Sequence, residues 1–260
     1  MHVSAYRRLL VVGCLLALGC RGGFNPAKFP NPVDLYTASL QRLEAGKTQD
    51  AIAGFEKLTL ELPARDTLLP RAHFHLGRAH AKRKDWLLAA QAFNRMASEF
   101  PDDTLADDAL LEAANSYAKI WDDPELDPTY GQSAIAVYQS LIDTYPTSSR
   151  RAEAERGIAR TQAQLAEKDF RIGGQYRRRR SPHSAILYYK QVLERFPDAP
   201  RVKDAYAKMA GVYKSIGYDE DYREICGAAR TRFPADPDIR SACSGAPVVA
   251  APATTTTPPP

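Results

Sequence analysis

Six side chains in the N-terminal third of the chain could bind a ligand that carries a carboxylate. Four are spaced by 3, 4 and 4 residues, which places them on one stripe of a helix: Arg71, Phe74, Arg78 and Lys82. Tyr36 and Leu40 form a corresponding stripe one repeat earlier. Charge-assisted hydrogen bonds from guanidinium to carboxylate are strong, and aromatic rings lie beside these cations. The alternative is a basic helix face that only meets solvent.

A second cationic group is the run Arg177, Arg178, Arg179 and Arg180, the densest charge cluster of the sequence. Cations at the end of a helix interact well with its dipole, so a solvated helix end is one interpretation. The functional interpretation is a contact with an acidic surface of a protein partner. Four arginines are a poor signal for nucleic acid, and the net charge of +4 falls to +2 once Arg7 and Arg8 of the leader are removed. We therefore expect no nucleic-acid partner.

Catalytic and metal-binding patterns are missing from the sequence. His73, His75 and His80 are close in sequence, but residues 73 and 75 of a helix point apart and no cysteine or acid completes a metal set. We attribute the three histidines to packing or chance. The sequence has no glycine-rich phosphate loop, Gly-x-Ser-x-Gly or HExxH motif. We predict a protein that is not an enzyme and has no metal site and no cofactor.

The first 19 residues are typical of an export signal, with a basic start at Arg7 and Arg8 and an apolar run from Leu9 to Gly19. The sequence "LALGC" that ends at Cys20 resembles the bacterial lipoprotein box, in which the cysteine becomes the acylated first residue. That resemblance implies lipidation at Cys20 and a membrane anchor, and Arg21 in place of an aspartate favours the outer membrane. We expect residues 20–30 to be a flexible tether.

The chain contains four cysteines, and Cys14 should be lost with the leader. Cys226 and Cys243 remain in a chain that should enter an oxidising compartment. The sequence allows a disulfide between them but gives no distance, and we expect two unpaired thiols. Residues 243–260, rich in Pro, Thr and Ala, are expected to be a disordered tail because they have too few large apolar side chains to offset the entropy of ordering.

A repeat extends over residues 31–242. Prolines that end apolar-periodic runs recur at Pro63, Pro101, Pro146, Pro197 and Pro234, with spacings of 38, 45, 51 and 37 residues. A small residue lies twelve positions before each of the first four prolines and an aromatic residue eight before, so the two share a helix face. These pairs are Ala51 and Phe55, Ala89 and Phe93, Ala134 and Tyr138, and Ala185 and Tyr189.

This helix–turn–helix–proline pattern resembles the tetratricopeptide repeat. It predicts an all-α fold, a tetratricopeptide-repeat superhelix of about five helix pairs. In such a stack the first helices line the concave face, where peptides commonly bind.

The unequal spacings resemble the BamD family, the lipoproteins of the outer-membrane β-barrel assembly machinery. The third unit carries an insertion rich in Asp and Pro, and the fourth begins with a long helix, about residues 151–176. The family's leucine-alanine-glutamate segment, glycine and tyrosine correspond to Leu165, Ala166, Glu167, Gly173 and Tyr176. The sequence "RRSPHS" at 179–184 departs from the family, which usually has a glycine turn there.

The resemblance implies a lipid-anchored scaffold on the outer membrane that faces the periplasm. It implies binding of the barrel subunit BamA and of unfolded outer-membrane proteins, whose ends carry an aromatic residue and a free carboxylate. An alternative is another outer-membrane repeat lipoprotein, such as a secretin pilotin or a cell-envelope scaffold. An enzyme that uses the repeats for docking would need a second globular domain, which the sequence lacks.

Overall fold

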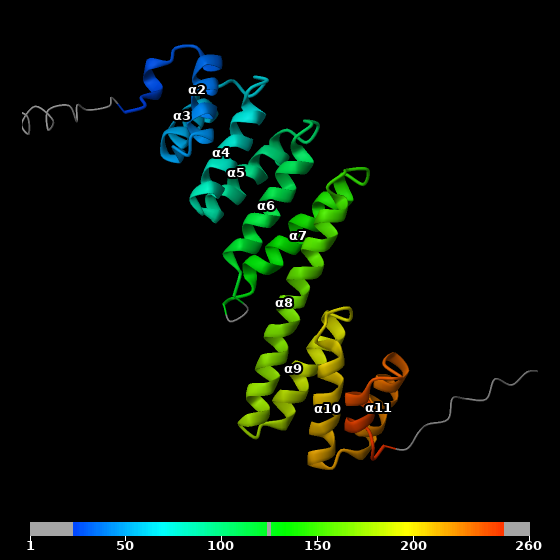
Figure 1. Ribbon diagram of the computed structural model, residues 1–260. Helices are drawn as coiled ribbons and strands as arrows, with labels where there is room; N and C mark the ends of the chain where they lie inside the picture. Colours follow the sequence, from blue (N-terminus) through cyan, green and yellow to red (C-terminus); the bar gives the residue numbers. More distant parts are fainter. Residues whose placement is uncertain (1–22, 124–125, 247–260) are drawn as a thin grey trace, which may run out of the picture. The chain divides into compact units, whose positions relative to one another are not determined.

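The computed structural model describes residues 23–123 and 126–246, and all the regular elements in these residues are helices (Figure 1). The predicted all-α class is therefore confirmed. Ten helices, α2 to α11, follow in the order that five helix pairs predict, and two short helices flank them. Their bounds are η1 Pro26–Lys28, α2 Pro32–Glu44, α3 Thr48–Glu61, α4 Leu69–Arg83, α5 Trp86–Glu99, α6 Ala106–Ile120, α7 Thr129–Thr144, α8 Arg151–Arg178, α9 Pro182–Arg195, α10 Val202–Ile216, α11 Asp219–Arg232 and α12 Pro237–Ala242.

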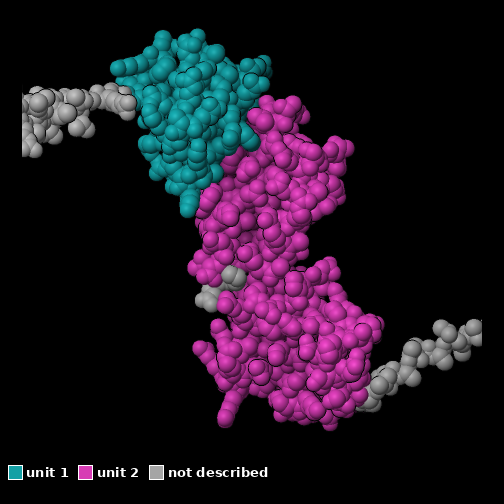
Figure 2. Space-filling model, in the orientation of Figure 1, with its two compact units in different colours: residues 1–85 teal, residues 86–260 magenta. Residues whose placement is uncertain are grey.

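The chain divides into two compact units, residues 1–85 and 86–260, which are coloured separately in Figure 2. Unit 1 contains α2, α3 and α4, and unit 2 contains α5 to α12. Among the described residues, no helix combines the length and the hydropathy that a membrane crossing requires. The expected signal peptide, Cys20 and the tail beyond residue 246 lie outside the described residues.

The repeat prolines mark helix ends, as the sequence predicts. Each of α3, α5, α7, α9 and α11 ends two residues before its proline, because proline has no amide donor and disfavours helix in the residue before it. In four of the five repeats the residue before this proline is aromatic, and two of these residues show how it packs. Phe196 is buried, and the Tyr145 hydroxyl donates a hydrogen bond to the Pro101 carbonyl at 2.7 Å, which joins two successive stops.

The four small–aromatic pairs form the core, and their eight side chains are at most 1 % exposed. In the fifth repeat the corresponding positions hold Tyr222 and Cys226, which are also buried. The helix face that each pair was predicted to share is therefore a buried face.

Unit 1 extends further toward the N-terminus than the sequence suggests. Residues 23–30 were expected to be a tether, but they include the helix η1, and the Phe24 and Phe29 rings lie 5.6 Å apart. The Arg42 guanidinium lies over the Phe24 ring at 5.3 Å and pairs with Asp50. Arg42 occupies a repeat position where an aromatic residue is usual, and Phe24 supplies the missing ring from outside the repeat.

Unit 2 is organised around the 28-residue helix α8. Its first half packs against α7 through Ala154, in a cluster with Tyr138 and Leu141. Its second half packs against α9 through Leu165 and Ala166 (Figure 1). One continuous helix therefore joins two apolar clusters, as the long fourth-repeat helix predicts.

Glycines allow α8 to approach these neighbours closely. A Cβ atom added at Gly157 would lie 2.4 Å from the Tyr138 ring, and one at Gly173 would lie 2.8 Å from the Tyr189 ring. Neither distance leaves room for a methyl group, so the two rings occupy the space that an α8 side chain would need.

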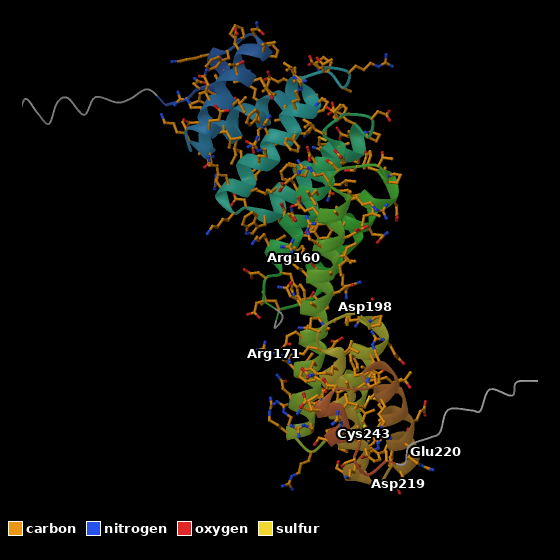
Figure 3. All side chains as sticks on the ribbon, turned by 45° about the vertical axis from the view of Figure 1, so that its right-hand side comes forward. Arg160, Arg171, Asp198, Asp219, Glu220 and Cys243 are labelled. Atoms are coloured by element: carbon orange, nitrogen blue, oxygen red, sulfur yellow. A yellow bond between two sulfur atoms is a disulfide. The ribbon has the colours of Figure 1, made fainter. Side chains whose placement is uncertain are left out.

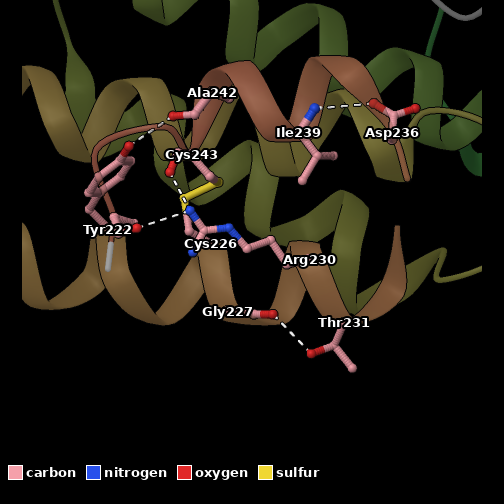
Figure 4. The surroundings of a disulfide bond; sticks show 10 residues. Tyr222, Cys226, Gly227, Arg230, Thr231, Asp236, Ile239, Ala242 and Cys243 are labelled. Carbon is pink, nitrogen blue, oxygen red and sulfur yellow. Dashed lines mark hydrogen bonds between the residues drawn. A yellow bond between two sulfur atoms is a disulfide. The ribbon is translucent and has the colours of Figure 1, made fainter. Parts of the chain in front are cut away.

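The expectation of two unpaired thiols is wrong, because Cys226 and Cys243 form a disulfide with Cα atoms 5.5 Å apart (Figure 4). No pattern in the sequence brings α12 back onto α11. Arg230 donates hydrogen bonds to the carbonyls of Cys243 and Ala246, and the Tyr222 hydroxyl donates to Ala242 at 3.0 Å. Cys243 and Ala246 are buried, so residues 243–246 belong to the fold and not to the tail.

The close approach at Gly157 predicts opposite effects of one substitution at two glycines. Gly157→Ala should lower the free energy of unfolding by about 1–3 kcal/mol, because its methyl group overpacks the Tyr138 ring. Gly211→Ala should raise it by about 0.5–1 kcal/mol, because its methyl group meets no atom within 4 Å and alanine favours helix. Urea unfolding of both variants measures this, and shifts of the same sign would contradict the packing account.

The disulfide closes a loop between residues 17 apart in sequence. Replacing both cysteines by alanine should lower the free energy of unfolding by about 3 kcal/mol, because the unfolded chain regains loop entropy. In thermal unfolding, a reductant should lower the melting temperature of the wild type toward that of the variant. The melting temperature of the variant should not change. A reductant effect of equal size on both proteins would show that the bond does not stabilise the fold.

Candidate functional site

Helices α2 and α4 both pack against α3 and also contact each other, which brings the predicted ligand-binding residues together in unit 1. Tyr36 and Leu40 are one turn apart on α2, and both are half-buried. Arg71 and Arg78 on α4 are exposed. The helices gain their stability from the apolar sides that face α3, which leaves these residues at the boundary with solvent.

Three aromatic rings support this boundary. The ring centroids of Tyr36 and Phe55 are 5.9 Å apart, those of Tyr36 and His75 are 5.8 Å apart, and those of Phe55 and His75 are 5.7 Å apart. Edge and offset-stacked contacts of this kind are favourable beyond the area that they bury. Phe55 is buried and fixes the other two rings, so Tyr36 and His75 have defined positions beneath the cations.

The two arginines act on both of these rings. Burial, together with the smaller effects of the nearby Arg78 and Arg71 charges, lowers the pKa of His75 to about 4. Burial also raises the pKa of Tyr36, against the opposing effect of Arg71 and Arg78. At neutral pH His75 is therefore uncharged and Tyr36 keeps its proton, and the positive charge near these rings comes from the two arginines.

His75 also orients Arg78. The Arg78 Nη1 lies 3.4 Å from His75 Nδ1, and because arginine can only donate, Nδ1 accepts and the ring proton is on Nε2. We call Tyr36, Arg71, His75 and Arg78 the cationic–aromatic face. The geometry suits a carboxylate that accepts from guanidinium groups beside an aromatic ring.

Sequence reasoning placed two further α4 residues with this group. Lys82 donates a hydrogen bond to the Leu43 carbonyl at 2.9 Å, so its charge is engaged at the end of α2. Phe74 is half-buried with its ring centroid 5.7 Å from that of His75. His75 was attributed to packing or chance, and its stacking on Phe55 confirms packing. The spacing of Arg71, His75 and Arg78, four and then three residues, would have placed it on the stripe.

The arginine run lies in unit 2. Arg177 and Arg178 are in the last turn of α8, Arg179 is its C-cap, and all four arginines are exposed. Arg180 has a φ of 57°, the left-handed conformation in which glycine is usual, and the amide of Ser181 bonds the Tyr176 carbonyl at 3.0 Å. The missing family glycine is thus replaced by an arginine in the same kind of helix-ending turn. Among the described residues, no His, Cys, Asp and Glu cluster could hold a metal ion.

Comparisons with known proteins agree with the sequence pattern. The family model described as "YfiO: Outer membrane lipoprotein" matches residues 30–225, about three quarters of the chain. The chain is 24% identical over 233 residues to an "Outer membrane protein assembly factor BamD" of Caulobacter vibrioides, covering 87% of this chain and 76% of that protein. A protein of the same name from Haemophilus influenzae is 23% identical over 251 residues, covering 89% and 95% of the two chains.

Solved structures of repeat proteins are also similar to the chain. A TPR repeats protein from Bacteroides fragilis matches with a TM-score of 0.49 and 15% identity, covering 82% of this chain and 96% of that one. The TPR domain of P58(IPK) matches with a TM-score of 0.43 and 11% identity, covering 82% and 54%.

The low pKa of His75 predicts how stability depends on pH. The unfolded histidine takes up a proton near pH 6.5 and the folded one only near pH 4, so stability falls as the pH falls between these values, by up to about 1.4 kcal/mol per pH unit. His75→Phe removes this contribution of His75 to the pH dependence of stability. Between pH 7 and pH 4.5 the variant should lose about 2 kcal/mol less than the wild type in urea unfolding. Parallel pH curves would contradict the assignment, since all other titrating groups are shared.

Proposed function

Because the chain belongs to the outer membrane lipoprotein family whose model matches residues 30–225, we propose that it is an assembly factor for outer-membrane proteins. The observation that carries this proposal is that match, together with relatives named as assembly factors that align over most of the chain. The chain acts as a binding scaffold and not as a catalyst. Helix pairs in series offer side chains at fixed positions and need no reactive group.

The cationic–aromatic face of unit 1 supports the first part of this function, the capture of unfolded outer-membrane proteins by their C-termini. The terminal carboxylate accepts hydrogen bonds from Arg71 and Arg78. The terminal aromatic side chain packs against Tyr36, Phe74 and the apolar Leu40. Lys82 contributes through the position of α4, since its ammonium group already bonds the Leu43 carbonyl.

The exposed arginines Arg177, Arg178, Arg179 and Arg180 support the second part, a contact with the BamA-type barrel subunit and its assembly partners. An acidic surface on that subunit would complement the run, and charge complementarity mainly increases the rate and specificity of such an association. The contact needs no nucleic acid and no cofactor.

Acylation at Cys20 anchors the scaffold to the outer membrane, on the side that faces the periplasm. One acyl chain binds a membrane only marginally, whereas the several chains of a bacterial lipoprotein hold a domain of this size firmly. The binding sites then stay close to the barrel that receives the substrate.

The capture of C-termini is tested with a fluorescent peptide that ends in phenylalanine with a free carboxylate. Arg71→Glu and Arg78→Glu should each weaken its binding about tenfold, because a charge-assisted hydrogen bond is replaced by a repulsion. Arg65→Glu makes the same charge change at another exposed arginine of unit 1, and it should alter affinity less than about twofold because of screening. The same peptide with an amidated end should bind weakly to all variants.

Unchanged affinity in Arg71→Glu and Arg78→Glu would remove the face as the peptide site. The assembly role itself is tested by purifying the full-length lipidated protein from solubilised outer membranes. It should bring a BamA-type barrel with it, and recovery without any such barrel would contradict the assembly role.

A further inference from the structure

Unit 2 contains a pocket of about 540 Å³ at the end of α8. The last turn of α8 contributes Arg177, the turn after it Arg180, and the start of α9 Pro182. Helix α10 supplies the opposite side with Lys208, Gly211 and Val212. The pocket thus joins two members of the arginine run to a cation from a separate helix.

The three cations of this pocket have no acidic partner. No ion pair within 4 Å involves Arg177, Arg180 or Lys208 in the part of the chain that the structure describes, in contrast to Arg150 with Asp108. Asp219 and Glu220 lie at the start of α11 (Figure 3). Within the described residues they form no ion pair with the three cations of the pocket. Arg177 hydrogen-bonds the Tyr189 hydroxyl, which does not neutralise its charge. The charge of all three cations is therefore available to a ligand.

The side of the pocket formed by α10 is open and partly apolar. Gly211 is exposed, and a Cβ atom added there would meet nothing within 4 Å. The buried Val212 lies next to it, and Pro182 adds an apolar surface from α9. A peptide backbone can approach α10 at Gly211 more closely than at any larger residue.

The shape of the pocket decides between anionic ligands. A compact phosphate group is bound best where donors converge on one point, but here the cations come from two elements and part of the lining is apolar. An acidic peptide segment matches both features, since its carboxylates can reach separate cations while its aliphatic atoms cover the half-buried Pro182.

We infer that this pocket binds an acidic peptide segment of a protein partner through Arg177, Arg180 and Lys208. The inference rests on the proposed function only for the kind of partner, a subunit of the assembly machinery. It separates the arginine run into two members that line the pocket, Arg177 and Arg180, and two that do not, Arg178 and Arg179. The proposed site also includes Lys208 of α10, a helix that the arginine run alone does not suggest as part of a binding site.

The test uses the purified full chain and a short labelled peptide of alternating glutamate and leucine, with a glutamine–leucine peptide as the uncharged probe. Lys208→Glu should weaken binding of the acidic peptide about tenfold, and Arg179→Glu, with the same charge change beside the pocket, less than about threefold. Gly211→Leu fills the pocket without a change of charge and should also weaken binding about tenfold. Gly227→Leu, in the neighbouring helix α11, is its control, because a Cβ atom there also meets nothing within 4 Å.

Thermal unfolding verifies that all four variants are folded. Equal losses for Lys208→Glu and Arg179→Glu would show that diffuse charge, and not the pocket, attracts the peptide. No effect of Gly211→Leu, or equal binding of vesicles rich in phosphatidylglycerol, would also overturn the inference. Copurification with a barrel is a separate measurement. If the chain binds the acidic peptide but recovers no barrel, the pocket is supported and the proposed function is contradicted.

Discussion

Close contact between helix backbones and aromatic rings is the constraint on which unit 2 depends. Gly157 and Gly173 of α8 lie against the rings of Tyr138 and Tyr189, and Gly131 of α7 lies against Trp121 in the same way. In each case the ring fills the space where a side chain would otherwise stand. Dense packing of this kind tolerates little change, so the glycines fix the distances between α7, α8 and α9.

The two α8 contacts are sixteen residues apart, about 24 Å along the helix axis. A helix held at two such points has a defined direction, and the position of its C-terminal end follows from it. That end carries the arginine run, and it lies where Arg177 and Arg180 face Lys208 of α10. The surface charge of the pocket is therefore placed by the core.

The sequence predicted what depends on local pattern. Spacing within single helices predicted three features: the helix ends before the repeat prolines, the small–aromatic pairs and the long α8. The structure has all three. The features that the sequence did not predict are contacts between segments, which the repeat period does not determine. Phe24 replaces an absent repeat aromatic from outside the repeat, and Cys243 returns to Cys226 through a turn after α11. Of the candidate site, spacing alone singled out Tyr36, Arg71 and Arg78 as candidates, whereas His75 was not among them because its uncharged ring depends on burial by other helices.

The two cationic surfaces share one construction. His75 is stacked on the buried Phe55 and accepts from Arg78, and the buried Tyr189 fills the space at Gly173 and is hydrogen-bonded by Arg177. In each case a ring of the repeat core also holds a guanidinium group at the surface. Loss of the ring must then affect both the packing of the core and the position of the charge, whereas loss of the arginine removes the charge and leaves the ring packed. This difference separates residues that position a charge from residues that present it.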